Sequence, residues 1–300
     1  MEKRSVDFKI VTFLAITHIL GIAGFVYIGI EPAFPWKTLI LGIVSFAISS
    51  LTVTGGLHRY YSHRSYRCAK PMAYFYALVG PSNVQGSPFE WVANHRRHHR
   101  YADGPLDPHN IKLGFWWAHI LWILFKHESY IPGSSITAHG IDISDLTCQP
   151  LLQFQYRWYN ALAAFWLIAP CVFAGLLWGD WIGGLLFVTF SRLLLQYHFT
   201  WSVNSFAHYF GPRQYSSRQT ARDNVWVGSV SLGEGGGHGF HHQFERDYRN
   251  GVRWFDLDPT KWAIWSCAFV GLASNLHRTE ERLIRKAKEL ARMQFPATDP

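Results

Sequence analysis

The sequence is short of charged residues. They make up 16% of the 300-residue chain, whereas an average soluble domain carries about 25%. The four cysteines, Cys68, Cys148, Cys171 and Cys267, are far apart and include no CxxC pair. This spacing excludes a zinc ribbon and a disulfide framework and is compatible with a reducing compartment. The sequence also has no internal repeat and no HExxH, which argues against a zinc protease.

Apolar and aromatic residues are abundant instead. Hydrophobic residues reach 49% and aromatic residues 17%, including 14 Trp, a composition that suits membrane interfaces and apolar tunnels. The formal net charge is +8, but no basic run belongs to a recognisable nucleic-acid-binding module. We therefore interpret the positive charge as lysine and arginine that face anionic lipid, and we expect no nucleic-acid partner.

Four apolar stretches match the ~20 residues that a helix needs to cross a bilayer. They cover about residues 10–30, 38–57, 158–179 and 181–203. The first stretch is not followed by a small-residue cleavage site, so we interpret it as a retained span. Arg192 interrupts the last stretch, and we expect its side chain to face another helix or to extend to the membrane interface.

The predicted fold class is an all-α integral membrane protein that forms one domain, residues 1–300. Its four transmembrane helices form two hairpins and carry a helical cytoplasmic cap with a histidine-rich dimetal site. The cap consists of residues 58–157 and 204–300. Ten Lys or Arg lie between His58 and Arg157, and the positive-inside rule places this side of the membrane in the cytoplasm.

Nine of the 16 histidines fall in four clusters on this predicted cytoplasmic side. The helical spacing of His95, His98 and His99 places them on roughly one face. By contrast, an α-helix would direct His58 and His63 to two separate points. Nine imidazoles are too many for one metal ion and about right for two, and imidazole suits Fe, Cu, Zn and Ni. The candidate ligands are His58, His63, His95, His98, His99, His208, His238, His241 and His242.

Four motifs contain all of these histidines: HRYYSH, EWVANHRRHH, NSFAH and the closing HGFHHQFERDYRNGVRWFDLDPTKW. In order and spacing they resemble the histidine boxes of membrane fatty acyl desaturases of the stearoyl (delta-9) type. The resemblance extends from about Thr54 to Trp262. It is specific, because it includes every box.

The resemblance implies an oxidoreductase with a di-iron centre. In that family nine histidines bind two iron ions and an asparagine contacts one iron through water, which here would be Asn204. The family uses O2 and two electrons to introduce a cis double bond into a saturated acyl chain, most often between carbons nine and ten. Elementary chemistry agrees, because no side-chain acid or base can attack an unactivated C–H bond without a cofactor. No catalytic residue beyond the ligands is implied, and the substrate-binding residues are unknown.

The last box departs from the family pattern at two places. One residue more than usual precedes His238, and Gly239 stands where the family has asparagine. Glycine absorbs an insertion at low steric cost, so we expect Gly235–Gly237 to be a flexible lead into a ligand helix of unchanged spacing. The missing asparagine would have supplied a supporting hydrogen bond, and Gln243 is the nearest candidate to replace it.

The resemblance also implies partners and a location. Ala93-Asn94 stands where animal acyl-CoA enzymes have Arg-Asp, so the acyl carrier remains open among acyl-lipid, acyl-CoA and acyl-carrier protein. No haem-binding or flavin-binding module is present, so a separate cytochrome b5 or ferredoxin is the implied electron donor. We expect a multi-pass membrane protein with its site on the cytoplasmic face, in a bacterial inner membrane rather than the endoplasmic reticulum.

Other interpretations remain open at this point. A related di-iron membrane hydroxylase is a second enzyme interpretation, although the NSFAH and DYRNG segments favour the desaturase. A histidine-rich metal transporter is a third interpretation, but it would need ligands near mid-bilayer on broken helices. A desaturase-like protein that binds metal without activity is a fourth, suggested by the extra glycine before His238. We expect His18 to pack or bond locally and His109 to belong to a turn. Structural or surface roles are expected for His119, His127, His139, His198 and His277.

Overall fold

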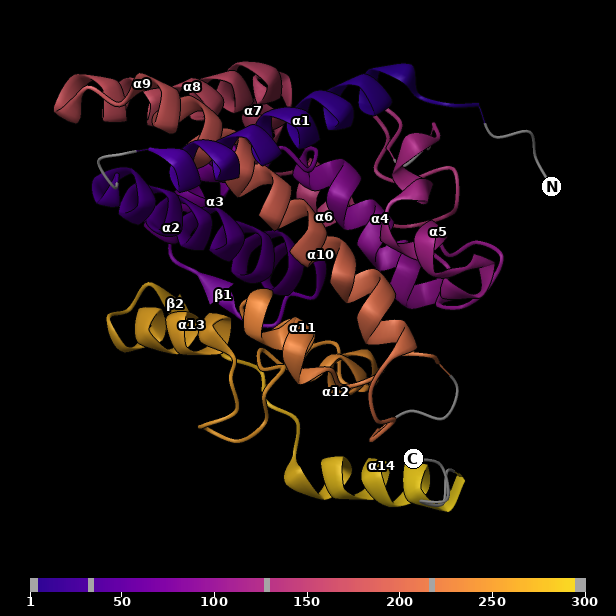
Figure 1. Ribbon diagram of the computed structural model, residues 1–300. Coiled ribbons are helices and arrows are strands. Elements are labelled where there is room, and N and C mark those ends of the chain that lie inside the picture. Colours follow the sequence, from indigo (N-terminus) through magenta and orange to yellow (C-terminus); the bar gives the residue numbers. More distant parts are fainter. Residues whose placement is uncertain (1–4, 32–34, 127–129, 216–218, 295–300) are drawn as a thin grey trace.

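The chain folds mainly into helices, as the computed structural model shows (Figure 1). Two short strands, β1 (Arg67–Cys68) and β2 (Ala273–Ser274), pair antiparallel within the cap. The prediction of a mainly helical protein is therefore confirmed. The structure describes residues 5–31, 35–126, 130–215 and 219–294, so the expectation for His127 lies outside the described residues.

Among the described residues, three helices are long and apolar enough to cross a membrane. They agree with the first three predicted spans. These helices are α1 (Phe8–Ile30), α8 (Tyr159–Trp178) and the continuous helix Trp36–Ser62, which joins α2 (Trp36–Leu51) to the π-helix η1 (Thr52–Ser62).

The fourth predicted span, residues 181–203, is helical but is not one of these three helices. Some of its polar side chains face other helices. Arg192 is 4% exposed, and its guanidinium donates to Ser49 Oγ (3.0 Å) and to the Ser82 carbonyl oxygen (3.0 Å). The expectation that Arg192 faces a helix partner is thus confirmed. The segment comprises α9 (Trp181–Gly183), the π-helix η5 (Gly184–Ser191) and α10 (Arg192–Tyr209).

Local sequence explains where these helices begin and how closely they pack. The Asp7 side chain caps α1 by accepting the backbone N–H groups of Lys9 and Ile10. Midway along α1, a Cβ atom on Gly24 would lie 2.5 Å from the Leu186 carbonyl oxygen. Only glycine therefore lets α1 and η5 approach to this distance, and this contact joins the two predicted hairpins.

The cap is built from short helices that follow η1 and α10. In Figure 1, α14 lies at the bottom, below α12. Ile284 and Ala287 of α14 pack with Phe240 of α12 and with Tyr215, so α14 supports the last histidine box from below. The helices of the cap are α3 (Lys70–Val79), α4 (Pro88–Tyr101), α5 (Phe115–His119), α6 (Ser144–Thr147), α7 (Pro150–Arg157), α11 (Val225–Val230), α12 (His238–Gln243), α13 (Pro259–Phe269) and α14 (Glu281–Gln294), with 3-10 turns at Gly80–Asn83, Ile111–Leu113 and Leu121–Leu124.

Candidate metal centre

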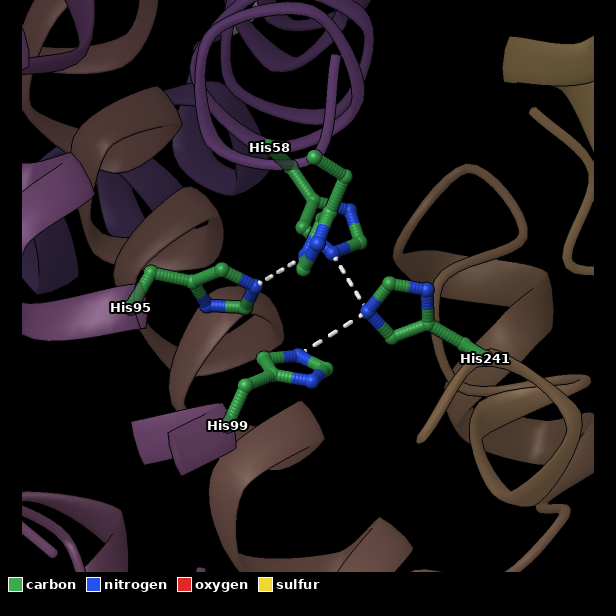
Figure 2. A group of neighbouring side chains, drawn as sticks. His58, His95, His99 and His241 are labelled. Carbon is green, nitrogen blue, oxygen red and sulfur yellow. Dashed lines mark hydrogen bonds between the residues drawn. The ribbon is translucent and has the colours of Figure 1, made fainter. Parts of the chain in front are cut away.

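Five of the candidate ligands form one group, and one ring nitrogen of each lies within 4.8 Å of the others. Figure 2 shows four of them converging on one point. The Nε2 atom of His241 lies 2.9 Å from His58 Nε2 and 3.1 Å from His99 Nε2, and His63 Nε2 lies 2.8 Å from His95 Nε2. Nitrogens at such distances can share one metal ion.

The other four candidates form a second group beside the first. Nitrogens of His98, His208 and His242 lie within 4.8 Å of one another. The Nε2 atom of His238 lies 3.0 Å from that of His208, and the Nε2 atoms of His98 and His242 are 3.3 Å apart. The structure therefore brings together all nine histidines singled out in the sequence, in groups of five and four.

The π-helix η1 explains why His58 and His63 share a group. Its hydrogen bonds link each residue to the fifth one along, and the His63 N–H donates to the His58 carbonyl oxygen at 3.2 Å. The two rings stand on one side, with centroids 4.9 Å apart. The expectation of two separate points was wrong, because it assumed α-helical rotation.

Helix α4 supplies ligands to both groups. Ser87 and Glu90 form a capping box that starts the helix. His95 and His99, four residues apart, belong to the first group, whereas His98 belongs to the second. The three side chains emerge on one side, as expected, but one helix serves both groups.

Carboxylates orient several of the imidazoles from behind. His58 Nδ1 lies 2.6 Å from a carboxylate oxygen of Glu234. The corresponding distances are 2.9 Å from His98 Nδ1 to Asp107 and 3.2 Å from His99 Nδ1 to Glu245. Such partners fix the tautomer and direct Nε2 at the metal. Sequence reasoning missed these carboxylates. A signal was present, since Glu234 lies just before the last box.

Side chains without charge orient two further imidazoles. The Nδ1 atom of His242 lies 2.9 Å from Gln219 Oε1, and that of His208 lies 2.9 Å from Thr220 Oγ1. Gln243, which was expected to replace the missing asparagine, is exposed. That expectation was wrong: Gln219, from the segment before α11, contacts His242 instead.

A buried ion-pair cluster holds Glu234 in place. Arg59 is 1% exposed and donates to Glu234 Oε1 (2.9 Å) and to Asp258 Oδ1 (2.9 Å). Burial raises the pKa of Glu234, but Arg59 and His58 outweigh that effect and the net pKa is lowered. Glu234 therefore remains a carboxylate, which can accept the His58 Nδ1–H.

Burial lowers the pKa of most of the histidines that lie beyond the membrane helices. The pKa of His208 falls to about 4, and neighbouring imidazoles lower the others further. Metal binding requires a neutral imidazole, so desolvation keeps the two groups in the form that coordinates. The pKa is also lowered in His63, His95, His98, His99, His238, His241 and His242.

The glycine run before the last box is a closely packed turn rather than a flexible lead. A Cβ on Gly237 would lie 1.9 Å from the Asn250 carbonyl oxygen, and one on Gly235 would lie 2.4 Å from Val227. At Gly236 the nearest atom would be 3.7 Å away, an ordinary contact. The inserted residue is thus accommodated by a turn in which two of the glycines are required.

We expect Gly237→Ala and Gly236→Ala to behave differently. The added methyl at Gly237 must displace the backbone of Asn250, so the protein should lose about 1–3 kcal/mol of stability and hold less metal. The matched change at Gly236 should leave the thermal midpoint and metal content close to those of the wild type. Both are measured on detergent-purified protein, and equal effects would contradict the close packing.

Two largely apolar cavities meet beside the histidine groups. Both are lined by Trp91, Thr200 and Asn204, and also by the ligand candidate His95. At the junction, Gln85 Nε2 donates to Thr200 Oγ1 (3.2 Å) and Trp91 Nε1 donates to Gln85 Oε1 (3.2 Å). Asn204 therefore lines both cavities, and members of both histidine groups line the first of them.

The remaining histidines include a second chain of contacts. His18 Nε2 lies 3.2 Å from His198 Nε2, and His119 Nε2 lies 3.1 Å from His198 Nδ1. His18 thus has partners as well as the local contact that was expected, to the Leu14 carbonyl oxygen (2.7 Å). His109 lies in a turn, as expected, and it is also buried, with its ring centroid 4.1 Å from that of His98.

The model of the fatty acid desaturase family matches residues 33–273. The chain belongs to this family. It is 41% identical over 251 residues to a probable acyl-CoA desaturase of Schizosaccharomyces pombe, covering 83% of this chain and 51% of the relative. It is 37% identical over 254 residues to acyl-CoA desaturase 1 of Saccharomyces cerevisiae, covering 84% and 48%. It therefore spans about half the length of these yeast relatives.

A mammalian member of the desaturase family aligns over more of its length. Stearoyl-CoA desaturase 4 of Mus musculus is 32% identical over 286 residues, which cover 95% of this chain and 78% of the relative. These relatives come from fungi and a mammal, so they do not favour the expected bacterial inner membrane.

Proposed function

We propose that this protein is a membrane fatty acyl-CoA desaturase. It introduces a cis double bond, at the delta-9 position, into a saturated acyl chain with O2 and two electrons from a separate donor. The observation that carries the proposal is the position of the two histidine groups beside a largely apolar channel. Family membership supports the same reaction.

We assign the nine histidines as ligands of two iron ions, with Asn204 as a ligand through water. The donor set fits this assignment, because neutral imidazoles converge through Nε2 while Glu234, Asp107 and Glu245 hold Nδ1. Imidazole also suits other transition metals, but this reaction needs a redox-active one. When bound, the iron pair supplies the O2 chemistry that no side chain can perform.

The protein itself would position the acyl chain and exclude water. The channel wall at Trp91 and Thr200 lies beside both histidine groups, so it determines which carbons stand next to the metals. Gln85 bonds both of these side chains and so holds them beside the histidine groups. The buried histidines and apolar lining keep bulk water from the reacting carbons.

Expression in a host that lacks unsaturated fatty acids tests the proposal. Gas chromatography of total fatty acids should show a new monounsaturated acid, with the double bond between carbons nine and ten. Cytochrome b5 and ferredoxin are the proposed donor types, and purified protein should oxidise one of them only when acyl-CoA and O2 are present. Hydroxylated acids in place of unsaturated ones would identify a hydroxylase and overturn the proposal.

We further propose that four spans form two hairpins with the metal centre on the cytoplasmic face. The eukaryotic relatives favour a membrane of the endoplasmic reticulum type. A cysteine introduced at Ser134, in the cap, should react with an impermeant maleimide only from the cytoplasmic side. Labelling from the opposite side would contradict this topology.

Phe46 of α2 lines the first cavity, and we propose that it limits the chain length. Phe46→Ala should remove the ring from the cavity wall, lengthen the cavity and let longer acyl chains enter. Since each buried methylene contributes about 0.8 kcal/mol, two added methylenes should shift the preference toward the longer acyl-CoA by about tenfold. Phe13→Ala, which alters the other cavity, is the control. Chain-length competition assays in which both variants match the wild type would rule out Phe46 as the limit.

A further inference from the structure

The cap exposes a patch of aromatic side chains that takes no part in the metal centre. Three of them lie along α13: Trp262 is 41% exposed, Trp265 54% and Phe269 82%. Their spacing of three and four residues places them on one face of the helix. Trp254, in the loop before α13, is also exposed, and its carbonyl oxygen accepts a bond from Trp262 Nε1 (3.0 Å). These four residues form the aromatic patch, and an exposed apolar surface of this kind marks an interaction site.

The exposed face of α13 carries no charged side chain. Lys261 is the only Asp, Glu, Lys or Arg between Pro259 and Leu276. It is 4% exposed, and its Nζ donates to the carbonyl oxygens of Gly251 (2.9 Å) and Arg253 (2.7 Å). A protein that docks through acidic or basic side chains would meet no complementary charge on this face, whereas the apolar part of a bilayer needs none.

Helix α13 begins beside a helix that is long and apolar enough to cross the membrane. Thr260, in the first turn of α13, contacts Thr54 through their hydroxyl oxygens (2.7 Å), and Thr54 belongs to the helix Trp36–Ser62. The predicted span ends at Leu57, so this contact lies about 5 Å inside it. In Figure 1, α13 lies below α2 and to the left of α12. The aromatic patch therefore starts at the depth of the membrane interface, where Trp is enriched.

The far end of α13 is also suited to an apolar surrounding. The chain turns back there, and the N–H groups of Gly271 and Leu272 donate to the carbonyl oxygens of Ala268 (3.1 Å) and Cys267 (2.8 Å). Val270, at the turn, is exposed. Backbone groups that lie in lipid need internal partners of this kind, so the turn can enter the bilayer without leaving these carbonyl groups unpaired.

We propose that the aromatic patch is a monotopic membrane anchor that lies in the leaflet next to the cap. The inference rests on the proposed membrane topology and adds to its four spans an element that enters the bilayer without crossing it. The 11 residues of α13 extend only about 16 Å, whereas the hydrocarbon core is about 30 Å thick. Asp258 caps α13 and also pairs with Arg59, so the anchor connects the bilayer to the ion-pair cluster that holds Glu234.

Photolabelling from within the bilayer tests the anchor on the wild-type protein. The protein is reconstituted in phosphatidylcholine vesicles that contain a phosphatidylcholine with a diazirine on its acyl chain, illuminated, and mapped by peptide mass spectrometry. Residues 259–270 should be labelled to an extent comparable to Ile19 and Ile22, which are exposed on α1. Ile136, 57% exposed in a loop of the cap, is the matched control and should stay unlabelled.

A charged variant tests whether the aromatic side chains cause the insertion. The double change Trp265→Glu and Phe269→Glu places two carboxylates on the patch, and carboxylates are unfavourable in the bilayer. Labelling of α13 should therefore fall by about tenfold, while labelling of α1 stays the same. Ile136→Glu should leave the labelling of α13 unchanged. The thermal midpoint and metal content report whether each variant is folded.

The outcomes separate the anchor from the topology on which it rests. Wild-type protein in which α1 is labelled but α13 is labelled no more than Ile136 would overturn the anchor alone. Crosslinks from α13 to a second copy of the chain instead of to lipid would overturn it as well, and would identify the patch as a protein interface. If neither α1 nor α13 were labelled, the proposed membrane topology and this inference would fail together.

Discussion

Replacing His241 with alanine should abolish desaturation and leave the purified protein with about one iron per chain instead of two. His241 Nε2 lies within 3.1 Å of both His58 and His99 in the first group, so its loss removes a central ligand. Because loss of supporting contacts alone commonly costs about 10–100-fold in metal affinity or activity, loss of a ligand should reduce activity by more than 100-fold.

The matched change in the second group is His98→Ala, which should also leave about one iron, bound in the other group. His277→Ala is the control, since His277 is exposed and belongs to neither group. Metal is counted by plasma emission spectroscopy and product by gas chromatography. A wild type with a single zinc ion, or iron content that neither histidine change alters, would show that these groups are not a di-iron site.

Removing the Arg59 side chain should destabilise the protein more than removing any exposed arginine. In Arg59→Leu, two carboxylates that are almost fully buried, Glu234 and Asp258, lose their cation. Breaking a buried ion pair in this way costs about 3–5 kcal/mol. The thermal midpoint in detergent should fall strongly, and metal should be retained poorly because Glu234 also contacts His58.

Arg64→Leu provides the comparison, because its ion pair with Asp145 is largely exposed. Exposed pairs contribute at most about 1 kcal/mol, so this variant should unfold close to the wild-type midpoint. Thermal unfolding followed by tryptophan fluorescence, with and without added iron, separates the stability effect from the metal effect. Similar midpoints for the two arginine variants would mean that the buried cluster does not stabilise the fold.

Much of the candidate site could be predicted from sequence because its signals are local. Three of the four spans appear as uninterrupted apolar runs, and the nine histidines appear in short clusters near span ends. The fourth predicted span is helical but is not among the helices apolar enough to cross a membrane, since Arg192 and Gln196 lower its hydropathy. Their hydrogen bonds to α2 involve residues more than 140 positions away in the chain, which no local pattern shows.

The errors also have physical causes. His58 and His63 were assigned to separate points because α-helical geometry was assumed, and hydrogen bonding of the π-helical kind changed their rotation. Gln243 was chosen as a supporting residue because it is near in sequence. The contact to His242 comes instead from Gln219, which approaches only when the segment before α11 folds over α12.

The sequence by itself determined the type and number of the candidate ligands and the apolar character of the three long helices, because these depend on residue identity and short-range spacing. Only the tertiary structure decided how nine imidazoles divide into five and four, and which carboxylates hold them. The reason is that hydrogen-bond partners, burial and cavity walls arise from side chains that are far apart in sequence and meet only when the helices pack.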